Sequence, residues 1–489
     1  MVEYRKDYEF LPFKTKFLGD KAVIFTYFGP WLALDKESYD KVRFGKIDDA
    51  LYSILEEKCI IKTPKNSEGI ETFVRDYNWN KGMGPTLHIF VPTLRCNQTC
   101  RYCYAYRVTE EQSGYDMTEE TAKAAVDFMF KTPSSTYSVE FTGGEPLLKF
   151  DIIRFIIEYS GRLAAENDKK IIYSVVTNGT LITDEMIDFF KDKKVGLCFS
   201  LDGPKEIHNG NRVFTKNPSS DNYSAVLNVL DRLRDEKYPS MNALPVITRD
   251  SLPIWKEIVD EYIARGFKLL RFKYVSNFGF ASGNWNNVGY SAEEYVAAWK
   301  KVIDYLVELN HKGITITEQL ATIMIKKILG RNPGYCELDM PCGAVIGQIL
   351  YNYDGKIYTC DEGRTMEEFS IGDVRTSSYA DVLGNPVTKT MVSISSNQSF
   401  GCTDCSYFAY CGTCPIENYK SSGTFMVNYP SSYRCKIHKA MFDYIFDKMV
   451  NDERYNYAFQ KWIHISENGF NSVSFDNDKD GWIGNRFED

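Results

Sequence analysis

The sequence has few histidines, no long apolar run and no block of basic residues, and each of these absences excludes a class of function. Only five of its 489 residues are histidines, and they do not share the close spacing of zinc ligands. No uninterrupted apolar segment approaches the roughly 18 residues that a membrane helix needs. Acidic residues outnumber basic ones by 66 to 58, so nucleic acid is not expected as the main partner.

The composition is that of a folded protein, with 44 % hydrophobic and 25 % charged residues, which excludes disorder. The first residues, MVEYRKDYEF, lack the basic segment and following apolar segment of a secretion signal. We therefore expect a soluble cytoplasmic protein without a membrane partner.

Cysteine is abundant by comparison. Eleven of the 13 cysteines fall into two groups, within residues 96–103 and 336–435. Because cytosolic thiols stay reduced, clustered cysteines there are typical of metal or redox sites rather than of disulfides. The other two, Cys59 and Cys198, each lie in an apolar run and are predicted to be buried small hydrophobic residues.

Between residues 86 and 275, apolar strands alternate with amphipathic helices. This alternation predicts a parallel sheet covered by helices. Six strand–helix units are too few to close an eight-stranded barrel, so we expect a partial barrel or an open sheet. The expected strands are 87–93, 138–142, 171–177, 195–201, 243–248 and 268–275. The expected helices are 118–131, 150–166, 183–193, 222–236 and 253–265, several of which begin with Thr or Asp as N-cap.

Different patterns flank this region. Residues 21–34 alternate apolar side chains around Gly29-Pro30, which predicts a hairpin, and residues 47–61 have helical spacing. Gly and Pro near residues 78–85 mark a boundary, so residues 1–84 are expected to form a separate small unit. After the alternating region, helices are expected at 292–311, 316–329 and 436–449. The Cys-rich segment before the last of these has too little apolar pattern for a core of its own, and we expect metal to stabilise it.

Cys96-x3-Cys100-x2-Cys103 directly follows the first expected sheet strand. Three thiolates on one loop can hold three irons of a [4Fe–4S] cube and leave the fourth iron free for a small chelating molecule. A zinc knuckle that lacks one ligand is the alternative. The spacing resembles the loop of the radical S-adenosylmethionine (SAM) superfamily, Cys-x3-Cys-x-aromatic-Cys, with Tyr102 at the aromatic position. That resemblance implies a cluster that binds SAM and converts it to methionine and a 5′-deoxyadenosyl radical.

Further motifs at expected strand ends extend this resemblance. Thr142-Gly143-Gly144-Glu145 resembles the family's GGE motif, which meets the SAM amino group. Asn178, Ser200, Asp202 and Arg212 follow the next two strands at positions that resemble SAM contacts in peptide-modifying members. Ser200 and Arg212 are the candidates for the SAM carboxylate, because the arginine fork can bind a carboxylate through two hydrogen bonds. The alternative is an ordinary turn at Asp202 and a surface position for Arg212.

The second group contains eight cysteines, the number that closes two four-thiolate sites. It resembles the SPASM domain, the C-terminal extension of radical SAM maturases that holds two auxiliary [4Fe–4S] clusters. That resemblance assigns Cys336, Cys342, Cys360 and Cys414 to the first cluster and Cys402, Cys405, Cys411 and Cys435 to the second. In the common pattern three residues separate the equivalents of Cys411 and Cys414, whereas only two separate them in this sequence. A pair of zinc sites is the alternative.

Asp361 and Glu362 directly follow the expected ligand Cys360. Asp361 matches the position at which sulfatase-maturing relatives carry a proposed general base, so the resemblance implies that these acidic residues take a proton from the substrate. A solvated acidic turn is the alternative.

The resemblance implies an α/β fold of radical SAM type, with a partial (β/α)6 barrel over residues 85–290. A helical bridge at 291–335, a SPASM domain at 336–440 and a C-terminal helix and tail at 441–489 would follow. Residues 1–84 resemble the small α+β, winged-helix-like element of ribosomal-peptide maturases, which pairs a leader peptide with its sheet edge. A purely structural N-terminal cap is the alternative.

Three stretches, LHIFVPTLRCNQTCRYC, SLDGPKEIHNGNR and NYDGKIYTCDEGRTM, resemble the radical SAM maturase of His-Xaa-Ser peptide systems. This implies an enzyme with three [4Fe–4S] clusters and SAM that abstracts hydrogen from a ribosomal precursor peptide and forms a carbon–carbon or thioether crosslink. Its implied partners are that peptide, a low-potential flavodoxin or ferredoxin, and a second maturase encoded beside it. The alternatives are formylglycine formation in a sulfatase and a non-catalytic metal-binding peptide carrier.

Overall fold

The computed structural model describes residues 7–396, 401–425 and 429–468, so residues 469–489 of the predicted C-terminal helix and tail lie outside the described residues. Eight strands form a central mixed sheet: β6 (Leu87–Thr93), β10 (Thr136–Gly143), β11 (Lys170–Thr177), β12 (Gly196–Ser200), β14 (Met241–Leu244), β19 (Gln348–Tyr351), β20 (Lys356–Tyr358) and β21 (Ser370–Asp373). Their order across the sheet is β14-β12-β11-β10-β6-β19-β20-β21. The first six in this order run parallel, and β20 and β21 are antiparallel to their neighbours.

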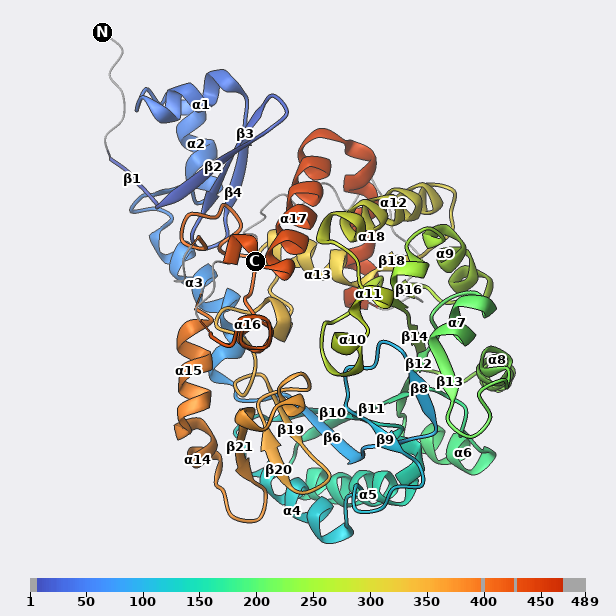
Figure 1. Ribbon diagram of the computed structural model, residues 1–489. Coiled ribbons are helices and arrows are strands. Elements are labelled where there is room, and N and C mark those ends of the chain that lie inside the picture. Colours follow the sequence, from blue (N-terminus) through green and yellow to red (C-terminus); the bar gives the residue numbers. More distant parts are fainter. Residues whose placement is uncertain (1–6, 397–400, 426–428, 469–489) are drawn as a thin grey trace.

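The five predicted helices of the alternating region are confirmed to within two residues at each end. They are α4 (Glu119–Phe130), α5 (Phe150–Glu166), α6 (Asp184–Asp192), α8 (Asn222–Asp235) and α9 (Trp255–Ala264), and a shorter α7 (Lys205–Asn211) was not predicted. The side chains of Thr118, Thr183 and Asp221 accept main-chain N–H groups at helix starts, which confirms the expected N-caps. These helices lie around the outside of the curved sheet (Figure 1).

The last two predicted strands are broken into short pieces. They form β15 (Val246–Ile247), β16 (Leu269–Leu270) and β17 (Lys273–Tyr274), and β16 pairs with β18 (Thr317–Glu318) while β15 pairs with β17. The physical reason is visible at Phe272, whose main-chain N–H donates to the Glu318 carboxylate at 3.2 Å instead of to a neighbouring strand. An uninterrupted strand over 268–275 was therefore wrong.

The Cys-rich region does not stand apart from the sheet. β19 pairs in parallel with β6, so this region adds three strands to the central sheet, which its irregular sequence did not predict. The helices of the second half of the chain are α10 (Gly279–Gly283), α11 (Trp285–Val288), α12 (Ala292–His311), α13 (Gln319–Ile328), α14 (Tyr379–Gly384), α15 (Pro386–Ile394), α16 (Pro415–Ser422), α17 (Tyr433–Asn451) and α18 (Glu453–Asn468). Among the described residues, none of the helices has the length and apolar character needed to cross a bilayer.

The N-terminal region contains the expected hairpin and helix. It has strands β1 (Glu9–Phe10), β2 (Phe13–Leu18), β3 (Lys21–Thr26), β4 (Trp31–Leu34) and β5 (Ile61–Lys62), and helices α1 (Lys36–Arg43), α2 (Asp49–Glu57) and α3 (Ser67–Tyr77). β2, β3 and β4 form an antiparallel sheet, and β1 pairs with β5. Figure 1 shows this sheet beside α17, far from the barrel strands. Four short strands, β7 (Arg95–Cys96), β8 (Gln98–Cys100), β9 (Val108–Thr109) and β13 (Arg212–Phe214), surround the first cysteine loop.

Candidate cofactor and metal sites

The first cysteine loop leaves the carboxyl end of β6 and is held by two short strand pairs. β7 carries Cys96 and pairs with β9, and β8 carries Cys100 and pairs with β13. In the second pair, Cys100 lies opposite Arg212, whose Nη1 is 3.7 Å from the Cys100 sulfur. The main-chain carbonyl of Cys103 accepts a hydrogen bond from Phe280 N at 2.8 Å. The backbone thus fixes all three predicted cysteines.

The three thiols of this loop interact with one another. Burial raises the pKa of Cys100 to about 12 and also raises the pKa values of Cys96 and Cys103. The neighbouring thiols Cys100 and Cys103 raise the pKa of Cys96 further, whereas Arg212 lowers that of Cys100. Three adjacent thiolates repel one another unless a cation lies between them. The loop therefore suits a positively charged metal centre bound by three sulfurs.

Gly143 and Gly144 lie directly against the cysteine loop. Gly144 N donates to Thr93 O at 2.9 Å. A Cβ at Gly143 would lie 2.4 Å from Thr93 O, and one at Gly144 would lie 2.3 Å from Arg95 O. Since any side chain would collide with the main chain, only glycine lets the end of β10 approach the loop this closely. The two glycines predicted to meet SAM thus also have a structural task.

Glu145 joins the ends of β10 and β11. Its buried carboxylate accepts hydrogen bonds from the Thr177 hydroxyl at 2.7 Å, from Asn178 N at 2.8 Å and from Leu147 N at 3.1 Å. Burial raises the pKa of Glu145 to about 7. The Asn178 amide donates to Asn97 Oδ1 at 2.8 Å, within the cysteine loop. Glu145 and Asn178 therefore lie together beside the loop, and both are engaged by protein groups.

Tyr102, Asp202 and Arg212 form a buried group beside the same loop. Asp202 is completely buried and accepts hydrogen bonds from the Tyr102 hydroxyl at 2.6 Å and from Arg212 Nε at 3.2 Å. The Arg212 guanidinium lies over the Tyr102 ring, 5.4 Å from its centroid. A surface position for Arg212 was therefore wrong. Thr142 is buried at the end of β10, and Ser200 is half-buried at the end of β12.

Asp361 connects the first cysteine loop with the Cys-rich region. It accepts a short hydrogen bond from the Tyr104 hydroxyl and forms an ion pair with Arg364, whose Nε lies 2.8 Å from Asp361 Oδ1. The Arg364 side chain is only 2 % exposed and also donates to Ala105 O at 3.3 Å and to Gly143 O at 3.5 Å. Asp361 is therefore a bonded group between two segments rather than part of a solvated turn.

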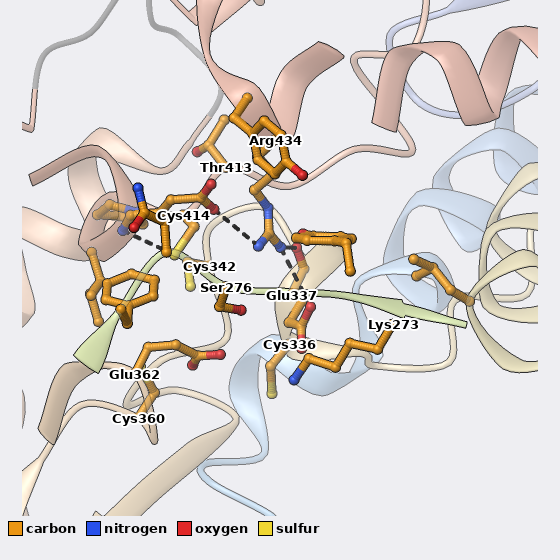
Figure 2. Close-up of a pocket in the computed structure, with 18 of the residues that line it drawn as sticks. Lys273, Ser276, Cys336, Glu337, Cys342, Cys360, Glu362, Thr413, Cys414 and Arg434 are labelled. Atoms are coloured by element: carbon orange, nitrogen blue, oxygen red, sulfur yellow. Dashed lines mark hydrogen bonds and ion pairs between the residues drawn. The ribbon is translucent and has the colours of Figure 1, made fainter. Parts of the chain in front are cut away.

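Four of the predicted auxiliary ligands line one cavity of about 50 Å³, which we call the first cavity. They are Cys336, Cys342, Cys360 and Cys414 (Figure 2). Glu362 also lines this cavity, as do Lys273 and Glu337. Glu337 forms ion pairs with Arg271 at 3.1 Å and with Arg434 at 3.7 Å. The cavity is therefore lined by thiols and by charged side chains of both signs.

The other four predicted ligands, Cys402, Cys405, Cys411 and Cys435, line a second cavity of about 300 Å³. Cys414 borders this second cavity as well. Burial, with Cys405 and Cys435, raises the pKa of Cys411 to about 12. His438 Nδ1 lies 3.9 Å from the Cys411 sulfur. The fold thus divides the eight cysteines between two cavities, with Cys414 at their boundary.

The donor sets can be compared with the groups they would hold. None of the 13 cysteines, all of which lie in the described residues, forms a disulfide. In the described parts of the chain, no three His, Cys, Asp or Glu side chains are arranged to hold a single metal ion. A cube of four irons gives each cysteine its own iron, so its thiolates need not converge on one point. The donors present at the loop and at both cavities are thiols, the side chains that bind iron–sulfur clusters.

Comparison with known proteins agrees with the first cysteine loop. Residues 90–262 match a family model described as the Radical SAM superfamily. These residues are a radical SAM domain. A match of this domain to that family model implies one [4Fe–4S] cluster and SAM as its cofactors.

Relatives of the radical SAM domain cover most of the chain. The cysteine-type anaerobic sulfatase-maturating enzyme of Clostridium novyi (strain NT) is 23 % identical over 365 residues, which are 74 % of this chain and 94 % of that enzyme. The structure of native anSMEcpe with bound AdoMet has a TM-score of 0.64 and 22 % identity, covering 76 % of this chain and 100 % of that chain. Streptococcus suis SuiB bound to precursor peptide SuiA has a TM-score of 0.52 and 13 % identity, covering 87 % and 98 %. The chain therefore has the radical SAM α/β fold.

Several residues around the radical SAM domain were not predicted. Tyr104 directly follows Cys103, and Arg364 lies four residues after Cys360, so closeness to a ligand was the available signal. His438 carries no signal of its own, because only the fold brings it beside Cys411.

The two cysteines outside the groups differ from each other. Cys59 is buried as predicted. Cys198 is only half-buried, on strand β12, and the nearby Glu140 carboxylate contributes to raising its pKa, although burial contributes most. The prediction for Cys198 is therefore confirmed only in part: the residue is partly exposed, yet its thiol lies in a place where burial raises the pKa.

Proposed function

We propose that the chain is a radical SAM peptide maturase that abstracts hydrogen from a ribosomal precursor peptide and forms a carbon–carbon or thioether crosslink. The observation that carries this proposal is the bridge at Asp361, which links the radical SAM loop through Tyr104 to the first cavity behind Cys360. A side chain bound there would meet both a hydrogen-abstracting centre and a carboxylate. SuiB, whose fold this chain shares, binds a precursor peptide.

In this proposal Cys96, Cys100 and Cys103 would hold a [4Fe–4S] cluster, and SAM would bind beside it. When bound, this pair supplies the 5′-deoxyadenosyl radical that abstracts hydrogen. Main-chain groups of the two glycines and polar side chains of the other predicted residues would surround and orient SAM: Tyr102, Thr142, Gly143, Gly144, Glu145, Asn178, Ser200, Asp202 and Arg212. Asp361 and Glu362 take the substrate proton, and Arg364 fixes Asp361 in position.

The Cys-rich region would hold two auxiliary [4Fe–4S] clusters, one in each cavity, as a SPASM domain. Support comes from the division of the eight cysteines into two sets. A low-potential flavodoxin or ferredoxin would supply electrons, and a second maturase of a His-Xaa-Ser system would act on the same peptide. The winged-helix-like N-terminal region would bind the leader peptide. Thirteen free thiols suit the reducing cytoplasm.

The test is anaerobic reconstitution followed by two measurements. Iron and sulfide analysis should give about twelve of each per chain, the content of three [4Fe–4S] clusters. Under reducing conditions the protein should release deoxyadenosine from SAM, and a co-expressed short peptide from a neighbouring gene should lose two mass units per event. The Asp361→Asn variant should still release deoxyadenosine but form less than a tenth of the product. Intact clusters without any deoxyadenosine would leave only a non-catalytic metal-binding carrier.

The sequence similarity to an anaerobic sulfatase-maturating enzyme favours a second candidate, formylglycine formation at Ser or Cys. Oxidation of Ser to formylglycine also removes two mass units, so total mass does not separate a crosslink from the Ser product, whereas conversion of Cys also replaces sulfur by oxygen and gives a different mass change. Fragment ions separate a crosslink from formylglycine. A crosslink suppresses fragments from the segment between the joined residues, whereas a peptide with formylglycine fragments along its whole length and reacts with hydrazides. A hydrazide-reactive, fully fragmenting product would establish the second candidate.

A further inference from the structure

One residue that lines the second cavity comes from the N-terminal region, far from the cysteines in the sequence. Lys16, on strand β2 of the N-terminal sheet, lines this cavity together with the cysteines. Figure 1 shows the N-terminal sheet beside α17, the helix that carries Cys435. The N-terminal region, which the sequence suggested to be a separate unit, therefore takes part in a predicted metal site.

Two contacts attach the N-terminal sheet to the loop between Cys402 and Cys405. Lys14 Nζ lies 3.1 Å from Asp404 Oδ1. The Tyr27 hydroxyl donates to Thr403 O at 2.8 Å. Both acceptors belong to the two residues that separate the first pair of predicted ligands, so a movement of the sheet would move these ligands.

Buried rings make the attachment firm. The Phe25 ring packs edge-on against Tyr407 and Phe446, at 5.6 Å and 4.9 Å between centroids. The Tyr410 hydroxyl donates to Gly29 O at 2.6 Å. All three aromatic partners are at most 1 % exposed, so this face of the sheet is part of the core and the region cannot swing as a tethered module.

Lys16 carries a charge at the cavity that is balanced locally. Its ammonium forms a close ion pair with Asp443 and lies 5.2 Å from the centroid of the Tyr407 ring. The Tyr407 hydroxyl also donates to Asp443. The side chains of Lys16 and Asp443 are 28 % and 36 % exposed, so solvent screens the pair only in part.

We propose that the N-terminal sheet is a working part of the second auxiliary cluster site: β2 closes the cavity, and Lys16 is a positioning residue that sets the reduction potential of the cluster held there. This inference rests on the proposed function, which places a [4Fe–4S] cluster on Cys402, Cys405, Cys411 and Cys435. The net charge and the solvent exposure around a cluster determine its potential. A nearby ammonium favours the reduced cluster, which is one charge more negative, and its removal would leave the Asp443 carboxylate unbalanced.

The test compares two lysines of the same strand and the same face. Lys14 and Lys16 both form ion pairs with aspartates of the C-terminal part, but Lys16 lines the cavity and Lys14 does not. Each is replaced by Met in the full-length chain, in a background with Cys96, Cys100 and Cys103 changed to Ala so that two auxiliary clusters remain. Potentials are then measured by redox titration with electron paramagnetic resonance.

We expect Lys16→Met to lower the reduced-to-oxidised ratio of one cluster about tenfold at a fixed applied potential. This corresponds to a reduction potential that is about 59 mV lower for a one-electron couple. Lys14→Met should shift the potential by less, because Asp404, although it also lines the cavity, is 84 % exposed, so solvent screens its charge. Lys16→Arg should keep the potential, and the double variant Lys16→Met/Asp443→Asn should return it towards the parent value, because local charge balance is restored. Equal potentials in the Lys16→Met and Lys14→Met proteins would overturn the proposal.

A second measurement covers the case in which Lys16→Met does not hold its cluster. Tyr27→Phe removes one hydrogen bond to the ligand loop and leaves Lys16 in place. Release of iron to a chelator should be at least threefold faster from this variant than from the parent, and an unchanged rate would count against closure by β2. If the wild-type chain binds about four irons instead of about twelve, the auxiliary clusters themselves are absent, and the proposed function fails at that point together with this inference.

Discussion

Arg364 joins Asp361 to two other segments of the chain. Its guanidinium reaches Asp361, the carbonyl of Ala105 after the cysteine loop, and the carbonyl of Gly143 at the end of β10. Three segments that are distant in sequence therefore meet at one buried cation. A buried ion pair adds little net stability as a pair, but removal of one member leaves an uncompensated charge.

We expect Arg364→Met to lower the free energy of unfolding by about 3 kcal/mol, because the Asp361 carboxylate would remain in a mostly buried place without its cation. The matched control is Arg375→Met, which breaks the exposed ion pair with Asp373 and should cost no more than about 1 kcal/mol. Urea denaturation of both variants gives the comparison. Losses of equal size would show that the Arg364 contacts are not special.

Gly144 lies so close to the main chain of the first cysteine loop that a side chain there should destabilise the protein. In Gly144→Ala the new methyl group meets two main-chain carbonyl oxygens, Arg95 O at 2.3 Å and Leu94 O at 2.5 Å, and neither can rotate away. We expect the free energy of unfolding to fall by about 1–3 kcal/mol, and the first cysteine loop to lose its place. Gly69→Ala, in helix α3 with open space around its Cβ position, should be neutral or stabilising by up to about 1 kcal/mol. Thermal unfolding of the two variants distinguishes these outcomes.

Strand β19 is the element that attaches the Cys-rich region to the sheet. It lies beside β6, and the Tyr351 hydroxyl is 2.9 Å from His88 Nδ1 across the two strands. The second ring nitrogen of His88 lies 3.1 Å from Pro85 O. His88 is completely buried, and burial lowers its pKa to about 3. The histidine therefore stays neutral in the folded protein.

This pKa predicts a pH dependence of stability. The folded pKa of His88 lies below its unfolded value of about 6.5, so the unfolded chain binds the proton first. The contribution of His88 is complete above pH 6.5 and is lost as the pH falls towards 3. Between pH 6.5 and 5 the wild-type protein should lose about 2 kcal/mol more than His88→Asn, measured by denaturant unfolding at both values. The exposed His311→Asn should follow the wild-type curve.

Among the helices and strands, those whose bounds depend on nearby residues were predicted correctly from the local sequence pattern. The apolar run at residues 87–93 and the helix at 150–166 have the bounds expected from the sequence. The run at 268–275 looked like one strand, but the Glu318 carboxylate from a distant segment takes the N–H group of Phe272. The pairing of β19 with β6 could not be predicted, because it joins residues more than 250 positions apart.

For the whole molecule, the site was predictable where spacing alone defines it. The cysteines of the first loop are identified by their intervals, whereas Arg364 and Lys16 belong to sites only because the chain folds back on itself. The sequence suggested an independent N-terminal unit because composition changes near residues 78–85. It carried no sign that Phe25 would be packed against α17.

Removal of iron tests the assembly as a whole. Each cavity brings several thiols together, and these thiols repel one another when they are ionised and no metal lies between them. The Cys-rich region should therefore lose order without its clusters. After chelation we expect amide hydrogen exchange at residues 336–396 and 401–425 to accelerate at least tenfold, while helices α4 and α5 keep their protection. The internal comparison makes a separate control protein unnecessary. Uniform acceleration over the chain would mean that the clusters stabilise the whole fold equally.

The parallel pairing of β19 with β6 has a consequence for electron movement. β6 runs into the loop of Cys96, and β20, two places along the same hydrogen-bonded sheet, runs into Cys360. The separation of these two thiols is then a property of one stiff scaffold rather than of a hinge between domains. If the clusters of the proposed function are bound on these thiols, the sheet would hold the distance between the two clusters nearly constant.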